Sequence, residues 1–120
     1  MTDRRVHYSI GEIKIVFVIK PRSFMHDYIA LNWVEPEESK RFGIRRNQVF
    51  VREDWWKNEA KQTRIMVHES VEIFLRLTFK LSYQQAHHLA TLAEHTEIKN
   101  RGWRLDGVVK HTRKPSIDLT

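Results

Sequence analysis

The chain of 120 residues contains no cysteine, only 4 glycines and only 3 prolines. Without cysteine, disulfide bonds, thiolate zinc sites and cysteine nucleophiles are excluded, so histidine and carboxylate side chains must hold any metal ion. The scarcity of glycine and proline, together with 41% hydrophobic and 30% charged residues, is typical of a folded domain. A chain of this length predicts one domain over residues 1–120.

Long hydrophobic runs are also absent from the sequence. The longest uninterrupted apolar run, Ile15 to Ile19, is far shorter than the roughly 20 residues that a membrane-spanning helix needs. The N-terminal residues carry positive charge but no hydrophobic stretch of signal-peptide length. We therefore expect a cytoplasmic protein with no membrane partner.

The net charge of +6 is unevenly distributed along the chain. Residues 101–120 contain five Lys and Arg against two Asp and Glu, which predicts a basic C-terminal tail from about residue 103. Residues 54–100 carry six charges of each sign and are therefore neutral. Positive charge at the ends of the chain favours an anionic partner.

Three segments in the first half of the chain have the pattern of strands. Val6 to Lys20 alternates with a break at Gly11, which indicates a hairpin or a bent strand, and its second half is apolar on both faces, as in a central strand. Asp27 to Val34 is a second candidate, although it would also tolerate a short helix, and Gln48 to Arg52 is the third. The polar segment Glu35 to Arg46 is expected to be a surface loop.

Two helices are expected in the second half, over about residues 58–80 and 83–100. Asp54 is a candidate N-cap for the first helix, which no glycine or proline interrupts. Ser82 and Gln85 form the capping-box pattern at the start of the second helix, in which the two side chains exchange hydrogen bonds with each other's backbone amides. The sequence thus predicts an α+β fold in which a small, mainly antiparallel sheet packs against two helices.

Histidine and glutamate residues lie beside the apolar faces of these helices. At 100° per residue, the faces expected to form the core are Val67, Val71, Phe74 and Leu75 in the first helix and Ala86, Leu89, Ala90 and Ala93 in the second. His68, Glu69 and Glu72 border the first face, and His87 and Glu94 border the second. Because the border between core and exterior is where a cleft forms, these five side chains are candidates for a site.

The spacing of His68 and Glu72 suits one metal ion, because residues four apart project from consecutive turns of a helix. A catalytic zinc needs a third protein ligand, and His87 is the best placed. Glu94 is a competing ligand or a hydrogen-bonding partner of one. These residues predict a divalent metal site, with zinc as the expected ion.

The segment His68-Glu69-Ser70-Val71-Glu72 resembles the His-Glu-x-x-His motif of the zincin metallopeptidases, with Glu72 in place of the second histidine. The order of strand, helix and second helix over residues 48–94 is also similar to the minimal zincin core. The resemblance implies that His68 is a ligand, that Glu69 is the general base and that a peptide is the substrate. It also implies that Gln48 to Arg52 is the sheet edge along which an extended substrate lies. A carboxylate at position 72 favours harder cations than an imidazole does.

The function expected from this pattern is that of a metal-dependent hydrolase. His68, Glu72 and His87 hold the ion, which lowers the pKa of a bound water, and Glu69 accepts the proton of that water. An alternative arrangement remains open, because a solvated helix face with i,i+4 ion pairing from Glu72 to Arg76 would have the same spacing, over Glu69, Glu72, Arg76 and Lys80. In that arrangement His68 bonds to a backbone carbonyl instead of a metal ion.

Two other functions remain open. The first is a small basic nucleic-acid-binding protein without catalytic activity, in which tryptophans stack on bases and cations contact phosphates, with Arg45, Arg46, Lys110, Arg113 and Lys114 as candidate contacts. No helix-turn-helix, RNA-recognition or zinc-finger pattern accompanies these residues. The second is a non-catalytic protein-interaction module, in which the helices support a binding surface.

Overall fold

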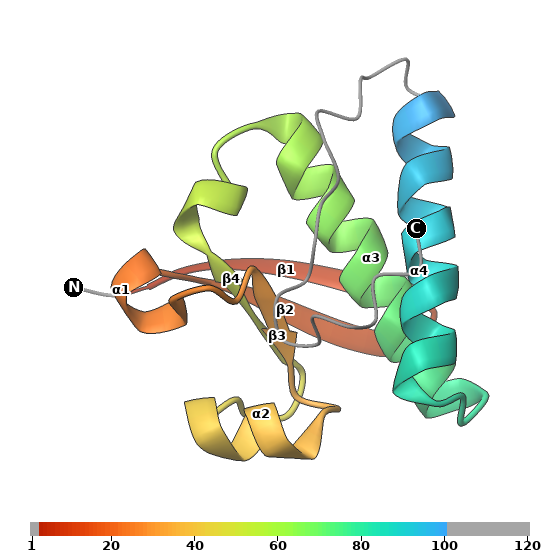
Figure 1. Ribbon diagram of the computed structural model, residues 1–120, viewed down its shortest axis with the longest axis horizontal. Helices are drawn as coiled ribbons and strands as arrows, with labels where there is room; N and C mark the ends of the chain where they lie inside the picture. The colour runs from red at the N-terminus through yellow and green to blue at the C-terminus, as the bar shows by residue number, and fades with distance from the viewer. Residues whose placement is uncertain (1–2, 101–120) are drawn as a thin grey trace.

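A four-stranded sheet with helices on both faces forms the described part of the protein, residues 3–100 of a computed structural model (Figure 1). Along the chain the elements are β1 (Arg4–Ile10), β2 (Ile13–Lys20), α1 (Arg22–Met25), β3 (Ala30–Asn32), α2 (Pro36–Phe42), β4 (Gln48–Arg52), the 3-10 turn η1 (Glu53–Trp55), α3 (Glu59–Thr78) and α4 (Tyr83–Asn100). The expected α+β class is confirmed. The expected basic tail lies outside the described residues.

The strand order in the sheet is β1-β2-β4-β3. The pairs β1/β2 and β3/β4 are antiparallel and β2/β4 is parallel, so the sheet is mixed, with two of its three pairings antiparallel. The expectation that Gln48–Arg52 is a sheet edge is wrong, because β4 pairs with a strand on each side. The reason is the side chains of β4: Val49 and Val51 pack on one face and Phe50 on the other, and an inner strand buries both faces.

The hairpin of β1 and β2 follows the expected pattern. Its two-residue turn contains Gly11 at φ +57°, a left-handed conformation that glycine adopts without steric cost. In β2, Ile15 and Phe17 face the larger core cluster, whereas Val18 faces the smaller cluster on the opposite side. The expectation that this strand is covered on both faces is therefore confirmed.

The two long helices begin and end close to the expected residues. Asn58 caps α3 by accepting a hydrogen bond from the backbone amide of Lys61 at 2.9 Å, so Asp54 is not the cap; it lies in η1 and pairs with Arg52 instead. The capping box at the start of α4 is confirmed, since the Ser82 Oγ accepts from the Gln85 amide at 3.2 Å and the Gln85 Oε1 accepts from the Ser82 amide at 3.1 Å.

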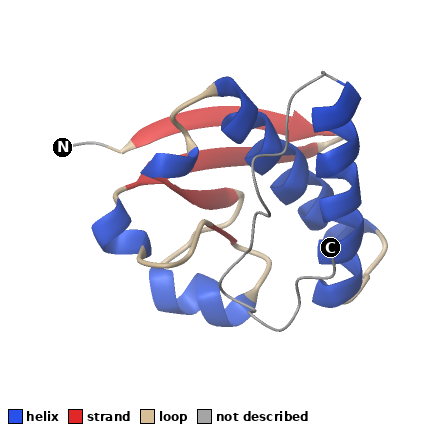
Figure 2. Ribbon diagram, turned by 45° about the horizontal axis from the view of Figure 1, so that its top comes forward, coloured by secondary structure: helices blue, strands red, loops and turns tan. Residues whose placement is uncertain are grey.

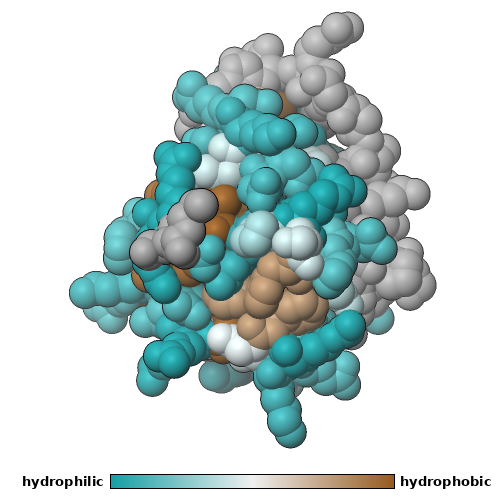
Figure 3. Space-filling view, turned by 90° about the vertical axis from the view of Figure 1, so that its left-hand side faces the viewer, coloured by the Kyte–Doolittle hydropathy of each residue, from teal (hydrophilic) through white to brown (hydrophobic). Residues whose placement is uncertain are grey.

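The helices are divided between the two faces of the sheet. α3 packs on one face through Ile65 and Ile73, and α4 packs chiefly on α3 (Figure 2). α1 covers the opposite face with Met25, next to Leu31 of β3. The side of the molecule that carries α1 is hydrophilic around a confined apolar area (Figure 3), away from the pair of long helices.

The segment expected to be a loop, Glu35 to Arg46, contains α2 instead. Pro36 stands at the first helical position, where its missing amide hydrogen leaves no bond unmade, and Gly43 ends the helix in the left-handed conformation. The expectation was wrong because a two-turn helix is too short to show periodicity. None of the helices among residues 3–100 is both long and apolar enough to cross a membrane.

Candidate metal centre

The interface between α3 and α4 is polar at its centre. α3 presents Arg64, His68 and Glu72 on successive turns, since residues four apart lie on one face of a helix. α4 presents His87 and Glu94 toward the same region. All five side chains are buried, and even the most accessible residue of the set, Arg64, is only 5% exposed. Buried charges of this number occur where they pair with one another or bind an ion.

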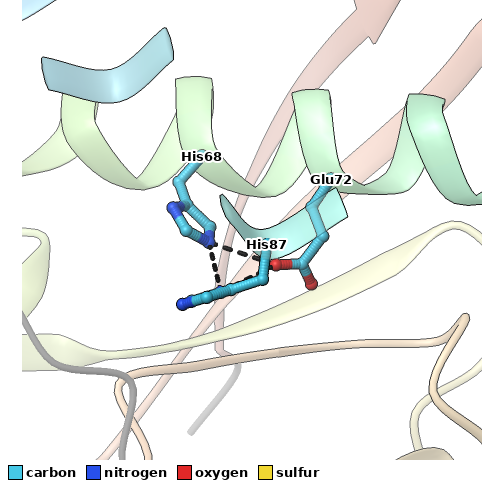
Figure 4. Close-up of side chains that lie close together, drawn as sticks. All are labelled: His68, Glu72 and His87. Carbon is cyan, nitrogen blue, oxygen red and sulfur yellow. Dashed lines mark hydrogen bonds and ion pairs between the residues drawn. The ribbon is translucent and has the colours of Figure 1, made fainter. Parts of the chain in front are cut away.

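Three atoms of this interface form a triangle, drawn in Figure 4. His68 Nε2 lies 3.1 Å from Glu72 Oε2, His87 Nδ1 lies 3.2 Å from the same oxygen, and the two nitrogens are 3.2 Å apart. The two ring nitrogens and the carboxylate oxygen can each offer a lone pair. A cation placed between them would accept one lone pair from each of the three corners.

The size of this triangle fits a small cation. Around a tetrahedral zinc with bonds of about 2.0–2.1 Å, neighbouring ligand atoms lie roughly 3.3–3.4 Å apart. The observed separations of 3.1 to 3.2 Å are about 0.2 Å shorter, so the side chains need to move little to admit the ion. The buried group of His68, Glu72 and His87 could thus hold a metal ion.

A chain of two further residues holds the His68 ring in place. Glu94 Oε1 lies 3.1 Å from His68 Nδ1, and its Oε2 accepts a 2.7 Å bond from Arg64 Nε. Because Nδ1 is occupied by Glu94, Nε2 is directed into the triangle. Histidine ligands in metalloproteins commonly make such a bond from the second ring nitrogen to a carboxylate, which fixes the tautomer and raises ligand basicity.

A third contact to the site comes from the sheet. Asn32, the last residue of β3, donates from Nδ2 to Glu69 Oε1 and to Glu72 Oε1, both at 3.2 Å. Glu69 therefore lies beside the ligand triangle on the side of the sheet, fully buried. The site thus receives side chains from three elements: β3, α3 and α4.

The buried charges change the ionisation of the site. Burial by itself lowers the pKa of His68, but hydrogen bonds to Glu72 and Glu94 and the charges of Glu72 and Glu69 raise it to about 10. Burial alone would raise the pKa of Glu94, yet its bonds to His68 and Arg64 leave that pKa below its usual value. Without an ion, a proton on His68 thus neutralises part of the negative charge.

The burial of the site differs from the expectation of a border position. The apolar residues expected to form the main core face of α3, namely Val67, Val71, Phe74 and Leu75, are only half-buried, and Leu89 of α4 is exposed. His68 and Glu72 lie deeper than any of them. The expected core face of α3 was therefore wrong in direction, since Ile65 and Ile73, on another side of the helix, are buried instead. Periodicity also treats histidine and carboxylate side chains as exterior, although they can be buried when they pair with one another or with Arg64.

Pockets among the described residues lie away from the cluster. A pocket of about 610 Å³ among the described residues lies near the start of β2 and the end of α3, where Lys14, Trp33, Arg46 and Leu77 contribute to its walls. A second pocket of about 420 Å³ adjoins β1 and β2. None of the residues of the metal centre lines either of these two pockets.

The alternative of a solvated helix face is also wrong. Glu72 is fully buried and bonds to His68, His87 and Asn32, while Arg76 pairs with Glu35 at 2.9 Å. His68 bonds to carboxylates rather than to a backbone carbonyl. Glu69 and Glu72 of α3 therefore lie in the interior of the protein.

Sequence reasoning missed two residues of the site. Arg64 could have been found, because it lies four residues before His68 on the same helix face. Asn32 has no local signal, since it lies 37 residues from Glu69 at the end of a short strand. Of the candidate nucleic-acid contacts, Arg45 and Arg46 are exposed after α2, and Lys110, Arg113 and Lys114 lie outside the described residues. Nucleic-acid binding stays a prediction.

Comparison with protein-family models, with curated proteins and with solved structures gives no significant match. The fold and the site define an α+β protein with a buried His–Glu–His group suited to a metal ion. Any assignment of function therefore depends on the geometry of that group.

Proposed function

We propose that the protein binds one zinc ion through His68 Nε2, Glu72 Oε2 and His87 Nδ1, and that it is a metal-dependent hydrolase. The observation that carries the proposal is the triangle of ligand atoms, whose separations of 3.1 to 3.2 Å are close to those of ligand atoms around one ion. Two imidazoles and one carboxylate are a donor set found in catalytic zinc sites.

The charge of the interface favours a divalent ion. Glu69, Glu72 and Glu94 are buried there, and Arg64 pairs with Glu94. Carboxylates held this close together attract a divalent cation. Removal of a charge from water costs several kcal/mol per ion, so a bound cation would offset part of the cost of burying the carboxylates.

The number of ligands favours a catalytic ion. Structural zinc sites are closed by four protein ligands, whereas catalytic sites use three and leave one position for water or substrate. Glu69 follows the ligand His68 directly and stands beside Glu72 on the shared amide of Asn32, so it is the carboxylate available to accept a proton from the activated water. A peptide substrate is inferred from the resemblance to zincins.

Metal binding is tested first by zinc content after purification and by titration of the metal-free protein. Wild-type protein should bind one zinc per chain, and His68→Ala and His87→Ala should each lose binding. His88→Ala is the matched control, since His88 is the next residue on α4 and lies outside the triangle. Full zinc retention by both ligand variants would reject the site.

Hydrolysis is tested separately with a mixed peptide library and mass-spectrometric detection of cleavage. Glu69→Gln should bind zinc as wild type does and cleave peptides about 10²- to 10⁴-fold more slowly, the usual contribution of a general base. Cleavage by Glu69→Gln at the wild-type rate would remove Glu69 from this role. Zinc binding without cleavage of any peptide would restrict the proposal to metal binding.

A further inference from the structure

Asn32 is a buried polar residue at the end of β3, and it reaches the metal centre from the sheet on which α3 packs. It is 1% exposed, and its amide contacts two carboxylates of α3 that lie three residues apart. We propose that Asn32 is a positioning residue, which fixes Glu72 as a one-oxygen ligand and holds Glu69 out of the ligand triangle. The inference rests on the proposed metal site and specifies how that site keeps a position open.

The orientation of the Asn32 amide is determined by its other contact. Asn32 Oδ1 accepts a hydrogen bond of 3.0 Å from the backbone amide of Val34. With the oxygen occupied there, both hydrogens of Nδ2 face α3, one for Glu69 Oε1 and one for Glu72 Oε1. Asparagine meets both demands at this length: aspartate has no hydrogens to donate, and glutamine is one methylene longer.

The contact between Asn32 and Glu72 gives the two oxygens of Glu72 different partners. Oε1 is held by Asn32, and Oε2 is the corner of the triangle shared with His68 and His87. A carboxylate that binds an ion with both oxygens fills two coordination positions. By holding Oε1, Asn32 limits Glu72 to one position and leaves another for the water that a hydrolase needs.

The same amide sets the position of Glu69. Because Glu69 Oε1 is tied to β3, the side chain is fixed to the sheet as well as to α3 and cannot join the ligands by a simple rotation. The base and the ligand are thus kept apart by one donor group, although they stand on the same helix. Partners of this kind beyond the ligands typically change metal affinity by about 10- to 100-fold.

Zinc affinity, measured by competition with a chromophoric chelator, tests this role. Asn32→Ala should bind zinc about 10- to 100-fold more weakly than wild type. Leu31→Ala is the matched control, because Leu31 is equally buried in the same strand but packs on the other face of the sheet. It should lower stability and leave the zinc affinity of the folded protein unchanged.

A double-mutant cycle separates positioning from a general loss of structure. The Asn32→Ala effect on affinity should persist in a Glu69→Gln background and disappear in a Glu72→Ala background, where the ligand it orients is already gone. The visible spectrum of the cobalt-substituted protein adds a direct readout. In Asn32→Ala its intensity should fall, because release of Oε1 lets Glu72 bind with both oxygens and raises the coordination number.

The outcomes distinguish this inference from the proposed function. If wild-type protein binds no zinc, the metal site itself fails. If wild type binds zinc but Asn32→Ala keeps wild-type affinity and an unchanged cobalt spectrum, only the positioning role is overturned. Should Asn32→Ala not fold, Asn32→Ser is used for the same measurements. The shorter serine side chain cannot reach both carboxylates, so this variant should bind zinc as weakly as expected for Asn32→Ala. Unchanged zinc affinity in Asn32→Ser would also overturn the role.

Discussion

The two sides of α3 pack in opposite ways. Toward the sheet, Ile65 and Ile73 join an apolar cluster with Phe17 and Val51. Toward α4, the buried contacts are ionic, through His68 and its partners. Apolar burial stabilises the fold at roughly 25 cal/mol per Å², whereas burial of paired charges is often neutral or costly compared with apolar residues of the same size. The comparison teaches that the sheet side stabilises the fold by apolar burial, whereas the α4 side contains the group that could hold a metal ion, at little or no gain in stability.

The largest expected effect comes from breaking a buried ion pair on the polar side. Arg64→Met should lower the free energy of unfolding of the metal-free protein by about 3–5 kcal/mol, because it leaves Glu94 buried without its 2.7 Å partner. Urea titration measures this change. Arg22→Met is the control, since the Arg22–Asp54 pair is 3.6 Å long and Arg22 is largely exposed; its effect should stay within about 0.5 kcal/mol. Equal changes in the free energy of unfolding would contradict the contrast between the buried and the exposed ion pair.

The next largest effect is the stabilisation of the folded protein by zinc bound on the polar side of α3. At a free zinc concentration one hundred times the Kd, the folded state gains about 2.7 kcal/mol, which corresponds to a rise in Tm of roughly 10 °C for a domain of this size. Differential scanning calorimetry with and without a chelator measures the rise. His88→Ala should show the same rise and His87→Ala none. A Tm that is indifferent to zinc in wild type would contradict binding to the folded state.

The pH dependence of zinc binding follows from His68. Its pKa is raised from 6.5 to about 10 in the folded protein, so in the absence of metal its stabilising effect is complete below about pH 6.5 and is lost as the pH rises through 10. Zinc binds only the deprotonated ring, so between these values each zinc should release one proton from His68. The apparent affinity should then rise about tenfold per pH unit. Calorimetry in two buffers of different ionisation enthalpy counts the protons, and a count near zero at pH 7.5 would contradict this assignment.

The smallest effect is expected on the apolar side of α3. Ile73→Val removes one methylene from a fully buried position and should cost about 0.5–1.5 kcal/mol in urea titration. Zinc affinity should be unchanged within roughly twofold, because Ile73 contributes to the sheet-facing cluster and to none of the ligand contacts. A large loss of zinc affinity would show that the two sides of the helix are coupled.

Much of the fold could be predicted because its signals are local. The capping box of α4 uses contacts three residues apart, and the hairpin turn at Gly11 uses neighbouring residues. His68 and Glu72 could be paired for the same reason, since the helix repeat brings residues four apart together. The short helix α2 and the inner position of β4 could not be predicted, because the first lacks periodicity and the second depends on which strands pair.

The sequence by itself determined the chemistry available to this protein: with no cysteine, a metal site must use imidazole and carboxylate, and one helix turn already places two such groups side by side. Only the tertiary structure decided that His87 approaches them within 3.2 Å, that Arg64 and Glu94 support the ring of His68, and that Asn32 reaches the carboxylates from the sheet. The physical reason is range. Helical periodicity relates residues within a few positions, whereas burial and convergence of charges depend on packing between segments that are tens of residues apart.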